Sequence, residues 1–481
     1  MPKVSAPQGR RIWHPELRSS AGPVYRAIAD ALEADIAAGR LGSGARLPSQ
    51  RALARALAVN LTTVTRAMRE AERRGLVIGS KGSGTFVASR LDQVPDWPDP
   101  FRRQAPAGFV DLSLNYPPDV AEADLADALA EWAGGLARRP QECRSLLPYR
   151  ATQGSAADRA AAASWLEEGG LAADPGRIVI CSGAQHGLGL SLAALAHPGA
   201  KVLCEALAYP GLRAVAATAG LKLLPVPMDS GGLRPAALRD AIRQHAPAGL
   251  VCNPTLHNPT GVVTSLARRQ ELARMLRRAG LWVIEDDIYG ALTDAPPRSF
   301  AALLPERTVY LTSLSKTVAP GLRIGYLVAP DAAVLDGLLG AARASSWMTA
   351  PILAAIASSW IREGLAQRAV RQVRAELARR QRVVSQTLPS GLRSHPGGDV
   401  RSPHLWVPLA DASTEARAVA LLNQRGVGVT AGEAFRVGAT RSYGFRIGLG
   451  AARSVDVLTG ALVTIADALE RGEARRGRMV M

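Results

Sequence analysis

The feature that most constrains the fold is a repeated alternation of short apolar runs with amphipathic helical segments, from Val110 to about Leu469. The segments between the runs are rich in Ala, Leu and Arg. Strands that alternate with helices form a parallel sheet, because each helical crossover returns the chain to the end of the sheet where the next strand starts. The sequence therefore predicts an α/β domain. Its predicted strands are Arg177–Ile180, Lys201–Cys204, Gly249–Cys252, Leu281–Ile284 and Thr308–Leu311.

The rest of the chain divides around this α/β region. A helical stretch over Ala350–Thr387 leads into a smaller α+β subdomain at about residues 350–470. A segment that contains VPDWPDP has no apolar periodicity, which is typical of a semi-rigid linker. Because 481 residues exceed what one ordinary core holds, we expect a multidomain chain. The predicted boundaries are 1–20 for a flexible basic arm, 21–88 for a helical domain, 89–110 for the linker, 111–470 for the α/β domain and 471–481 for a disordered basic tail.

The positive charge is concentrated at the N-terminal end. The chain has a formal net charge of +17, and residues 1–90 contain fifteen Lys and Arg against six Asp and Glu. A basic domain of this kind is typical of proteins that bind a polyanion such as DNA. A solvated arginine-rich surface would give the same count, so the charge predicts a nucleic-acid partner only together with a motif.

Other features exclude several classes of protein. No apolar run is long enough to cross a bilayer, and the basic N-terminus lacks the apolar core of a signal peptide. The four cysteines form no CxxC pair, which argues against a zinc site or a disulfide scaffold. We therefore expect a cytoplasmic protein with no membrane partner and no metal.

The N-terminal domain has the pattern of a winged helix-turn-helix. Apolar residues four positions apart predict a first helix over Val24–Ile36 with one buried face. Ser49 is an N-cap residue before a second helix, Gln50–Leu57, and a third helix follows the turn Ala58–Asn60 and ends at about Arg74. Two short alternating runs around the glycine-rich turn GSKGSG then predict a β-hairpin wing.

The third helix of this domain is predicted to enter the major groove of DNA. A polar outer face rich in Thr and Arg, placed after a tight turn, is the geometry of a recognition helix. The segment RLPSQRALARALAVNLTTVTRAMREAERRGLV…GSGTFV resembles the GntR family of bacterial winged-helix regulators. Leu61 and Thr65 stand where some family members carry arginines, so the resemblance predicts no operator sequence. The outer face and the resemblance together predict contacts with double-stranded DNA by Arg51, Asn60, Thr62, Thr63, Arg66, Lys81 and Gly82.

One lysine of the α/β region, Lys316, stands in a segment whose other residues could bind a phosphate. Only five lysines occur in the chain, and Lys316 lies in SLSK soon after a predicted strand. Ser313, Ser315 and Arg323 share its short segment, and hydroxyl and guanidinium groups bind phosphate. An amine beside a bound phosphate and a buried aldehyde forms a Schiff base. A lone loop lysine is usually only solvated, so this prediction depends on the rest of the chain.

Residues that precede Lys316 in the chain could supply the other groups of a pyridoxal-phosphate site. Ser182–Gln185 joins a strand to a helix, where free N–H groups and the helix dipole attract phosphate. Tyr209 could stack on a pyridine ring, and Asn258 and Tyr289 could hydrogen-bond its hydroxyl group. Asp286 could pair with the ring nitrogen and keep it protonated, which makes the ring an electron sink. Each residue alone also has an ordinary structural explanation, such as a tight turn or half-buried packing.

Together these motifs resemble the fold-type-I aminotransferases over roughly residues 111–470. The shared motifs are L-P-Y, S-G-A-Q, A-Y-P-G, N-P-T-G, E-D-D-x-Y, S-x-S-K-x-x-x-P-G-x-R and F-R-I-G. The resemblance implies pyridoxal phosphate on Lys316, with Asp286 and Tyr209 as the other catalytic groups. It implies that Arg446 receives a substrate carboxylate, whereas the segment Asp399–Pro403 departs from the family pattern. Further cofactor contacts are implied for Ser182, Gly183, Ala184, Gln185, Asn258, Tyr289, Ser313, Ser315, Arg323 and, in the neighbouring subunit's site, Tyr149.

The order of the parts resembles the MocR subfamily of GntR regulators from end to end. That resemblance implies a homodimeric transcriptional regulator whose DNA binding responds to a small amino compound or to the cofactor. Every residue that transamination needs is present, so an active aminotransferase with an appended DNA-binding domain fits the same sequence. A DNA-binding scaffold without a cofactor fits less well, because it leaves Lys316, Asp286 and Arg323 unexplained.

Overall fold

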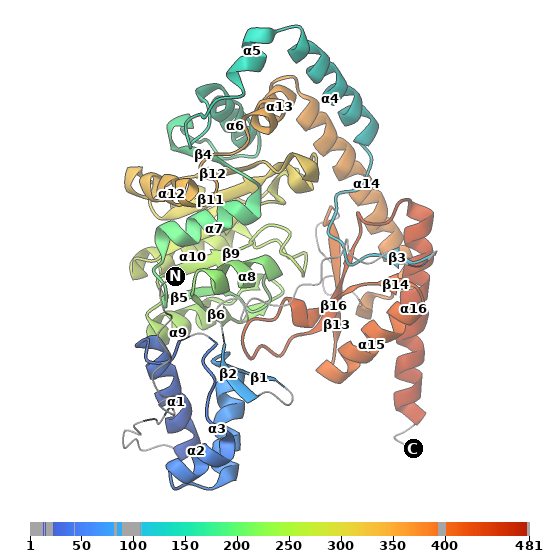
Figure 1. The fold of residues 1–481 in the computed structure, drawn as a ribbon. Helices are drawn as coiled ribbons and strands as arrows, with labels where there is room; N and C mark the ends of the chain where they lie inside the picture. The colour runs from blue at the N-terminus through green and yellow to red at the C-terminus, as the bar shows by residue number, and fades with distance from the viewer. Residues whose placement is uncertain are drawn as a thin grey trace, which may run out of the picture. The chain divides into compact units, whose positions relative to one another are not determined.

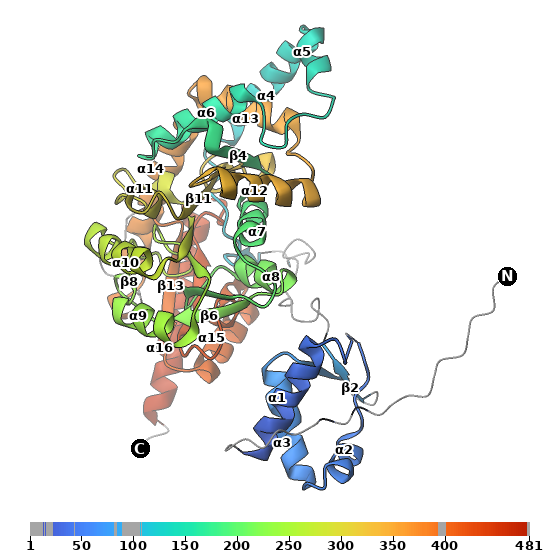
Figure 2. The same ribbon diagram turned by 90° about the vertical axis from the view of Figure 1, so that its left-hand side faces the viewer.

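The structure of the protein, a computed structural model, contains two compact units, Met1–Asp96 and Trp97–Met481 (Figures 1 and 2). It describes residues 13, 15, 23–42, 44–80, 84–88, 106, 108–392 and 401–478. Most of the predicted arm, the turn of the wing with Lys81 and Gly82, and most of the predicted linker lie outside these residues. Within the described part of the chain, no helix combines the length and the apolarity that a membrane crossing requires.

The N-terminal unit is a three-helix domain with a two-stranded wing, as the sequence predicts. Its elements are α1 (Val24–Ala37), α2 (Gln50–Ala56), α3 (Leu61–Arg73), β1 (Val77–Ser80) and β2 (Gly84–Val87). The side chains of Ser49 and Asn60 accept hydrogen bonds from the first turns of α2 and α3, which explains where both helices begin. Val64, Met68 and Ala71, the predicted inner positions of α3, are buried in the core of the domain.

The second unit is built on a seven-stranded sheet with the order β4-β12-β11-β10-β9-β5-β6. These strands are β4 (Ile178–Cys181), β5 (Lys201–Glu205), β6 (Lys222–Val226), β9 (Gly249–Cys252), β10 (Trp282–Asp286), β11 (Thr308–Ser313) and β12 (Gly325–Val328). The predicted strands overlap β4, β5, β9, β10 and β11. The pairings among the predicted strands are parallel, whereas β12, which was not predicted, is antiparallel to both β11 and β4. Its connection from β11 contains only short 3-10 turns, and a parallel pairing needs a longer crossover.

Helices cover both faces of this sheet (Figure 2). Along β5, Val202 and Cys204 pack in the cluster that contains α7, α8 and α12, whereas Leu203 packs in the cluster that contains α9, α10 and α11. Adjacent strand residues point to opposite faces, so a strand covered on both sides is a continuous apolar run. The helices are α7 (Ala184–Leu195), α8 (Pro210–Thr218), α9 (Pro235–His245), α10 (Leu266–Ala279), α11 (Phe300–Leu303) and α12 (Ala332–Ser345).

A third group of helices packs at the β4 and β12 edge of the sheet, around Trp165, Tyr326 and Trp360. It consists of α4 (Glu122–Ala137), α5 (Pro140–Ser145), α6 (Ala156–Glu168), α13 (Pro351–Arg362) and α14 (Leu365–Thr387). The helical stretch predicted over residues 350–387 is present, and it consists of two helices, α13 and α14. Gly364 breaks it with a φ of +72°, a left-handed conformation that glycine adopts without strain.

The smaller subdomain combines both ends of the second unit. Its main sheet has β16 (Tyr443–Gly448) in the centre, and β16 pairs antiparallel with β13 (His404–Leu409) and with β15 (Thr430–Ala431). The prediction that it begins near residue 350 missed β3 (Val110–Asp111), which pairs with β14 (Val427–Gly428). Strand β3 is too short to show a periodic apolar pattern, so its pairing with β14 is what assigns it to the smaller subdomain. Helices α15 (Ala412–Gln424) and α16 (Val455–Arg478) complete the smaller subdomain. The short hairpin β7 (Met228–Asp229) and β8 (Gly232–Leu233) belongs instead to the larger part of the unit, where Leu233 packs with α9 and α10.

Two expectations about the chain ends were wrong where the structure describes them. The backbone of residues 471–478, predicted to be disordered, continues α16. Its Glu, Ala and Arg residues favour helix, and the preceding turns are anchored by buried Leu462 and Ile465. In the predicted arm, Trp13 is fixed on the N-terminal unit, because its Nε1 donates a hydrogen bond of 2.7 Å to Asp35.

Candidate functional site

The residues predicted to bind a cofactor gather at the carboxyl ends of the central strands. Asp286 ends β10 and Ser313 ends β11. Lys316 lies in the 3-10 turn that follows β11, and its amine donates a hydrogen bond of 2.6 Å to Asn115 O. In α/β sheets this edge is where ligands bind.

The environment of Lys316 makes its amine a better nucleophile. Burial, Arg446 and Arg323 together lower the pKa of the Lys316 amine from 10.5 to about 8, and Asp286 acts in the opposite direction. A lower pKa leaves a larger neutral fraction of the amine at neutral pH, and only the neutral amine attacks an aldehyde. The same surroundings place these four side chains within electrostatic reach of one another.

The groups beside the lysine fit a bound phosphate. Gly183 begins α7 with a φ of +84°, and a Cβ atom there would lie 2.8 Å from the Arg323 guanidinium. Arg323 Nη2 lies 3.5 Å from Ser182 O, so the cation faces the N-terminus of α7. The buried hydroxyl groups of Ser313 and Ser315 are 3.0 Å apart. A guanidinium, two hydroxyls and a helix N-terminus together suit a phosphate monoester.

Tyr209 and Gln185 form a pair at the first turn of α8. The Tyr209 hydroxyl donates a hydrogen bond of 2.8 Å to Gln185 Oε1. Gln185, predicted as a phosphate contact, therefore holds the tyrosine ring with its side chain. Gly211 packs against both residues, because a Cβ atom at that position would overlap the ring of Tyr209 and the amide of Gln185.

We predict that Gly211→Ala weakens cofactor binding about tenfold or more, because the added methyl group displaces Tyr209 and Gln185. The measurement is an absorbance titration of apoprotein with pyridoxal phosphate. Gly340→Ala is the control, since nothing lies within 4 Å of a Cβ atom there. Equal affinity in folded Gly211→Ala and wild-type protein would show that Tyr209 does not contact the cofactor.

Asp286 is a buried carboxylate with an unsatisfied oxygen. Its Oδ1 has no hydrogen-bond partner among the described residues, and burial and the neighbouring Asp287 raise the pKa of Asp286 to about 7. A positively charged N–H group opposite this oxygen, such as a protonated pyridine nitrogen, would donate a hydrogen bond to it. The same group would favour the ionised form of the Asp286 carboxylate. Asn253 holds the segment in place, because its amide donates to Asp286 O at 2.7 Å and accepts from Asn258 N at 2.8 Å.

Arg446 extends from β16 of the smaller subdomain into the same site. Its Nη1 donates a hydrogen bond of 3.0 Å to Asn258 Oδ1, and its Nη2 donates one of 2.6 Å to Ser113 O. The guanidinium lies 5.1 Å from the centre of the Phe435 ring and is only 6% exposed. Burial lowers the pKa of Arg446 to about 10. A buried cation without a carboxylate opposite it favours binding of an anion.

Ser113 and Asn115 also belong to the site, although no sequence pattern predicted them. Besides accepting from Lys316, Asn115 donates a hydrogen bond of 2.6 Å from Nδ2 to the Tyr289 hydroxyl. The segment is placed by the β3–β14 pairing and by Gly448, where a Cβ atom would overlap Leu114 O. No spacing or motif near residue 113 points to this role, so sequence patterns could not have found it.

His404 was also missed as a site residue. Its ring lies edge-on to Tyr289, with 5.4 Å between ring centres, and its Nε2 is 2.9 Å from His257 O. It directly follows the unusual segment Asp399–Pro403, of which only residues 401–403 are described. Tyr149 does not join the cluster within this chain: it is 82% exposed and packs edge-on against Trp347, 6.2 Å away.

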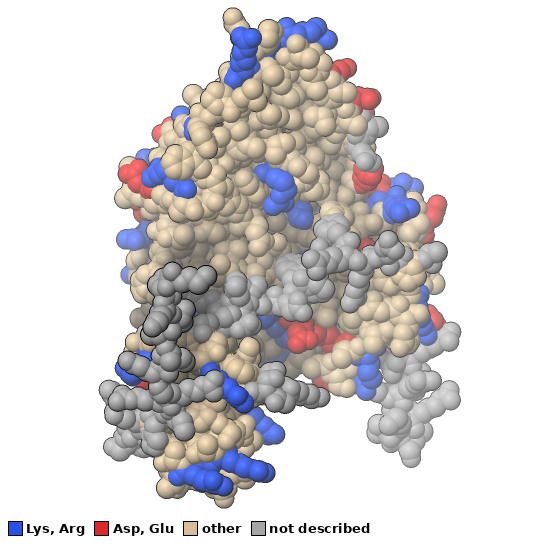
Figure 3. Space-filling model, viewed as in Figure 1, with Lys and Arg blue, Asp and Glu red and all other residues tan. Residues whose placement is uncertain are grey.

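The predicted DNA face lies on α2 and α3 of the N-terminal unit. Arg51, Thr62 and Arg66 are exposed, and Figure 3 shows arginine side chains over the end of the unit that carries these helices. Asn60 Oδ1 caps α3 by accepting from Thr62 N at 3.1 Å. The Arg66 guanidinium lies over the Tyr25 ring at 4.5 Å, which stiffens its side chain.

Two family models match the chain. Residues 108–465 match the aminotransferase class I and II family, and residues 24–87 match the gntR family of bacterial regulatory proteins. The vitamin B6 salvage pathway transcriptional repressor PtsJ of Salmonella typhimurium is 31% identical over 91% of this chain and 97% of its own length. The pyridoxine biosynthesis transcriptional regulator PdxR of Corynebacterium glutamicum is 29% identical over 91% of this chain and 94% of its own.

A solved structure supports the same assignment for the second unit. LysN, the α-aminoadipate aminotransferase of Thermus thermophilus in complex with N-(5'-phosphopyridoxyl)-L-leucine, superposes with a TM-score of 0.67 and 25% identity, over 76% of this chain and 94% of that one. The second unit therefore has the fold of pyridoxal-phosphate aminotransferases, and pyridoxal phosphate is its cofactor. The chain belongs to the aminotransferase class I and II family and, with its GntR helix-turn-helix, to the GntR regulators of the MocR architecture.

Proposed function

We propose that the protein is a pyridoxal-phosphate-dependent transcriptional regulator, which binds DNA through its first unit and senses a small ligand through its second. The observation that carries this proposal is the joining of a GntR helix-turn-helix to a cofactor unit in one chain. Relatives that match over both parts, PtsJ and PdxR, are named transcriptional regulators. When bound, pyridoxal phosphate supplies an aldehyde that binds amines and a ring that accepts electrons.

The roles of the site residues follow from their chemistry. Lys316 binds the cofactor aldehyde, Asp286 holds the proton on the ring nitrogen, and Tyr209 stacks on the ring. Support comes from the lowered pKa of Lys316 and the unsatisfied oxygen of Asp286. The phosphate is assigned to Ser182, Gly183, Ala184, Gln185, Ser313, Ser315 and Arg323, and the phenolic oxygen to Asn258 and Tyr289.

The ligand we favour carries a primary amine and a carboxylate. Only an amine can displace Lys316 from the cofactor, and the buried Arg446 suits a bidentate carboxylate. Arg446 comes from the smaller subdomain but bonds Asn258 of the larger one, so a carboxylate here would change the contacts between the two subdomains. A second candidate signal is the cofactor itself, because PtsJ and PdxR are named for vitamin B6 salvage and pyridoxine biosynthesis.

We propose that the regulator is a homodimer that acts in the cytoplasm, where its DNA partner lies. Support comes from an exposed apolar patch: Tyr149 and Trp347 are in contact and are 82% and 52% exposed, and nearby Leu147 is 72% exposed. A second copy covering this patch would bring Tyr149 to the neighbouring subunit's cofactor. Two DNA-binding units in one dimer would bind an operator bivalently.

The experiment that tests the proposed function follows the cofactor and DNA together. Amino compounds are titrated into the purified protein while the visible absorbance and the affinity for DNA from its own genomic neighbourhood are recorded. A regulator changes its DNA affinity at the concentration that changes its absorbance. An active aminotransferase with an appended DNA-binding domain would instead turn over amino acids and keep its DNA affinity constant.

We predict that Arg51→Ala and Thr63→Ala each weaken DNA binding, by about tenfold for Arg51→Ala, and leave the cofactor absorbance unchanged. Loss of the Arg51 contact should also reduce the slope of log affinity against log salt by about one. The measurement is fluorescence anisotropy at several salt concentrations. Arg274→Ala, an exposed arginine on α10, is the control for net charge. Unchanged DNA affinity in both variants would exclude the predicted DNA face.

We predict that the rate of cofactor attachment to apoprotein rises with pH and levels off above about 8, the pKa of Lys316. Below this pKa the amine is protonated, so the reactive fraction grows about tenfold per pH unit until the pKa is reached. Stopped-flow absorbance from pH 6 to pH 10 measures the profile. A rate that still rises near pH 10 would mean that Lys316 keeps an ordinary lysine pKa.

A further inference from the structure

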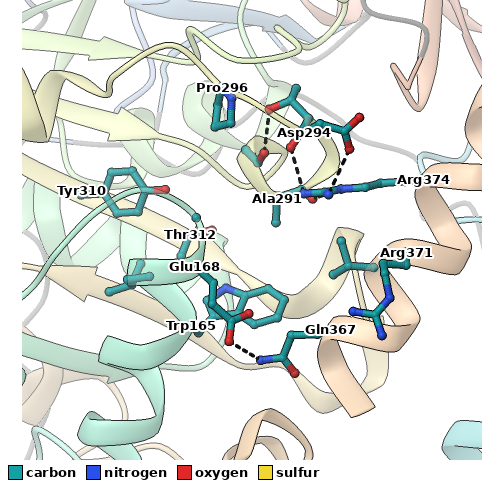
Figure 4. A pocket seen from close by; sticks show the side chains of 15 residues that line it. Trp165, Glu168, Ala291, Asp294, Pro296, Tyr310, Thr312, Gln367, Arg371 and Arg374 are labelled. Carbon is teal, nitrogen blue, oxygen red and sulfur yellow. Dashed lines mark hydrogen bonds and ion pairs between the residues drawn. The ribbon is translucent and has the colours of Figure 1, made fainter. Parts of the chain in front are cut away.

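A cavity of about 230 Å³ lies in the aminotransferase unit, and Lys316 does not line it. It opens between α6, α14, β11 and the 3-10 turn Gly290–Leu292 (Figure 4). Its apolar lining includes Trp165, Leu166 and Val370, which are 6%, 2% and 6% exposed. The cavity therefore has a buried apolar wall, and the charged residues of α6 and α14 line it as well.

Two opposite charges line this cavity, and neither has an ionic partner among the residues that the structure describes. The Glu168 carboxylate accepts a hydrogen bond of 3.0 Å from Gln367 and has no cation opposite it among the described residues. Arg371 on α14 is exposed and has no hydrogen bond or ion pair in the described part of the chain. Arg374, in contrast, is engaged, because it contacts Asp294 at 3.1 Å and donates to backbone carbonyls (Figure 4). Besides the Arg374–Asp294 ion pair, the cavity thus presents the Glu168 carboxylate, the Arg371 guanidinium and an apolar wall.

We propose that this cavity binds a small zwitterion, an amino acid with an apolar side chain. Its carboxylate would pair with Arg371, its ammonium group would pair with Glu168, and its side chain would lie against Trp165. A small cavity lined by apolar side chains and a few placed charges is the usual form of a ligand site. This binding is separate from the Lys316 site and does not depend on the proposed role in DNA binding.

Two residues that line the cavity, Tyr310 and Thr312, also form hydrogen bonds with Asp287, next to the cofactor site. The Tyr310 hydroxyl donates a hydrogen bond of 2.7 Å to Asp287 Oδ2, and Thr312 Oγ1 donates one of 3.1 Å to Asp287 O. Asp287 directly follows Asp286, and Gly290 at the cavity directly follows Tyr289. A ligand that moves Tyr310 would therefore shift the charge next to Asp286. Binding of a ligand in the cavity should therefore change the fluorescence of the cofactor.

The binding test uses protein whose cofactor has been fixed on Lys316 by borohydride, so that no amino acid can exchange with it. Calorimetric titration with leucine, methionine and phenylalanine should give one saturable site per chain for at least one of them. The matching carboxylic acids without the amine, and amines without the carboxylate, should bind at least tenfold more weakly. No saturable binding by any of the three amino acids would overturn the proposal.

Variants then locate the site. Arg371→Gln and Glu168→Gln should each weaken binding at least tenfold, whereas Arg368→Gln, an exposed arginine on the same helix outside the cavity lining, should not. Arg446→Ala should also leave this binding unchanged, which separates it from ligand binding at the Lys316 site. Equal affinity in Arg371→Gln, Glu168→Gln and wild-type protein, all with the same melting temperature, would overturn the proposal.

The coupling is tested with Tyr310→Phe, which keeps the cavity wall and removes the hydrogen bond to Asp287. In wild-type protein the amino acid should change the fluorescence of the fixed cofactor. In Tyr310→Phe it should bind with similar affinity and cause a smaller change. A full fluorescence change in Tyr310→Phe would show that Tyr310 does not transmit the signal to the cofactor.

Discussion

Borohydride treatment of the purified protein should attach pyridoxal phosphate permanently to Lys316 and to no other residue. The reason is local, since Lys316 is buried beside the proposed phosphate groups and its pKa is lowered to about 8. Lys201 and Lys222 lie at exposed strand starts, and no anion-binding group is predicted beside them. Peptide mapping of the reduced protein measures which lysine carries the cofactor.

Lys316→Ala should abolish this attachment completely, because no other described amine lies in the site. Lys201→Ala is the matched control and should retain full labelling and the visible colour. Labelling of several lysines at similar levels, or full labelling of Lys316→Ala, would contradict the assignment. A folded Lys316→Ala protein that still binds DNA would also show that DNA binding does not require the covalent link.

Arg446→Ala should raise the effector concentration for half-maximal response by about 30-fold or more. Removing one partner of a buried charge pair costs about 2–5 kcal/mol, and each 1.4 kcal/mol is tenfold in affinity. Arg446 is 6% exposed, so water cannot replace its contact with a carboxylate. The measurement is a titration of amino acids in which absorbance and operator binding are followed together.

Arg453→Ala, an exposed arginine a short distance further along the chain, is the control for loss of charge. It should respond at the same concentration as wild-type protein. If Arg446→Ala also responds at that concentration, or if the active effector lacks an amine, the proposed ligand chemistry is wrong. The response would then point to the cofactor itself as the signal.

Local patterns were enough to predict several parts of this protein. Capping residues and apolar spacing placed the three helices of the N-terminal unit, because these signals act within a few residues of the chain. The continuous apolar runs predicted the central strands, because both faces of the sheet are covered. The orientation of β12 was not predictable in this way, since its length and composition suit either direction.

The sequence by itself determined the residue types of the site, and the tertiary structure decided which of them meet. Lys316, Asp286 and Arg446 stand in motifs that could be recognised when they were taken together. Asn115 could not be recognised, because its segment is brought to Lys316 by the distant strand β14 and by Gly448. The cavity lined by Glu168 and Arg371 likewise forms where α6 and α14 approach β11. A pattern records what lies nearby along the chain, whereas a binding site depends on contacts between distant segments.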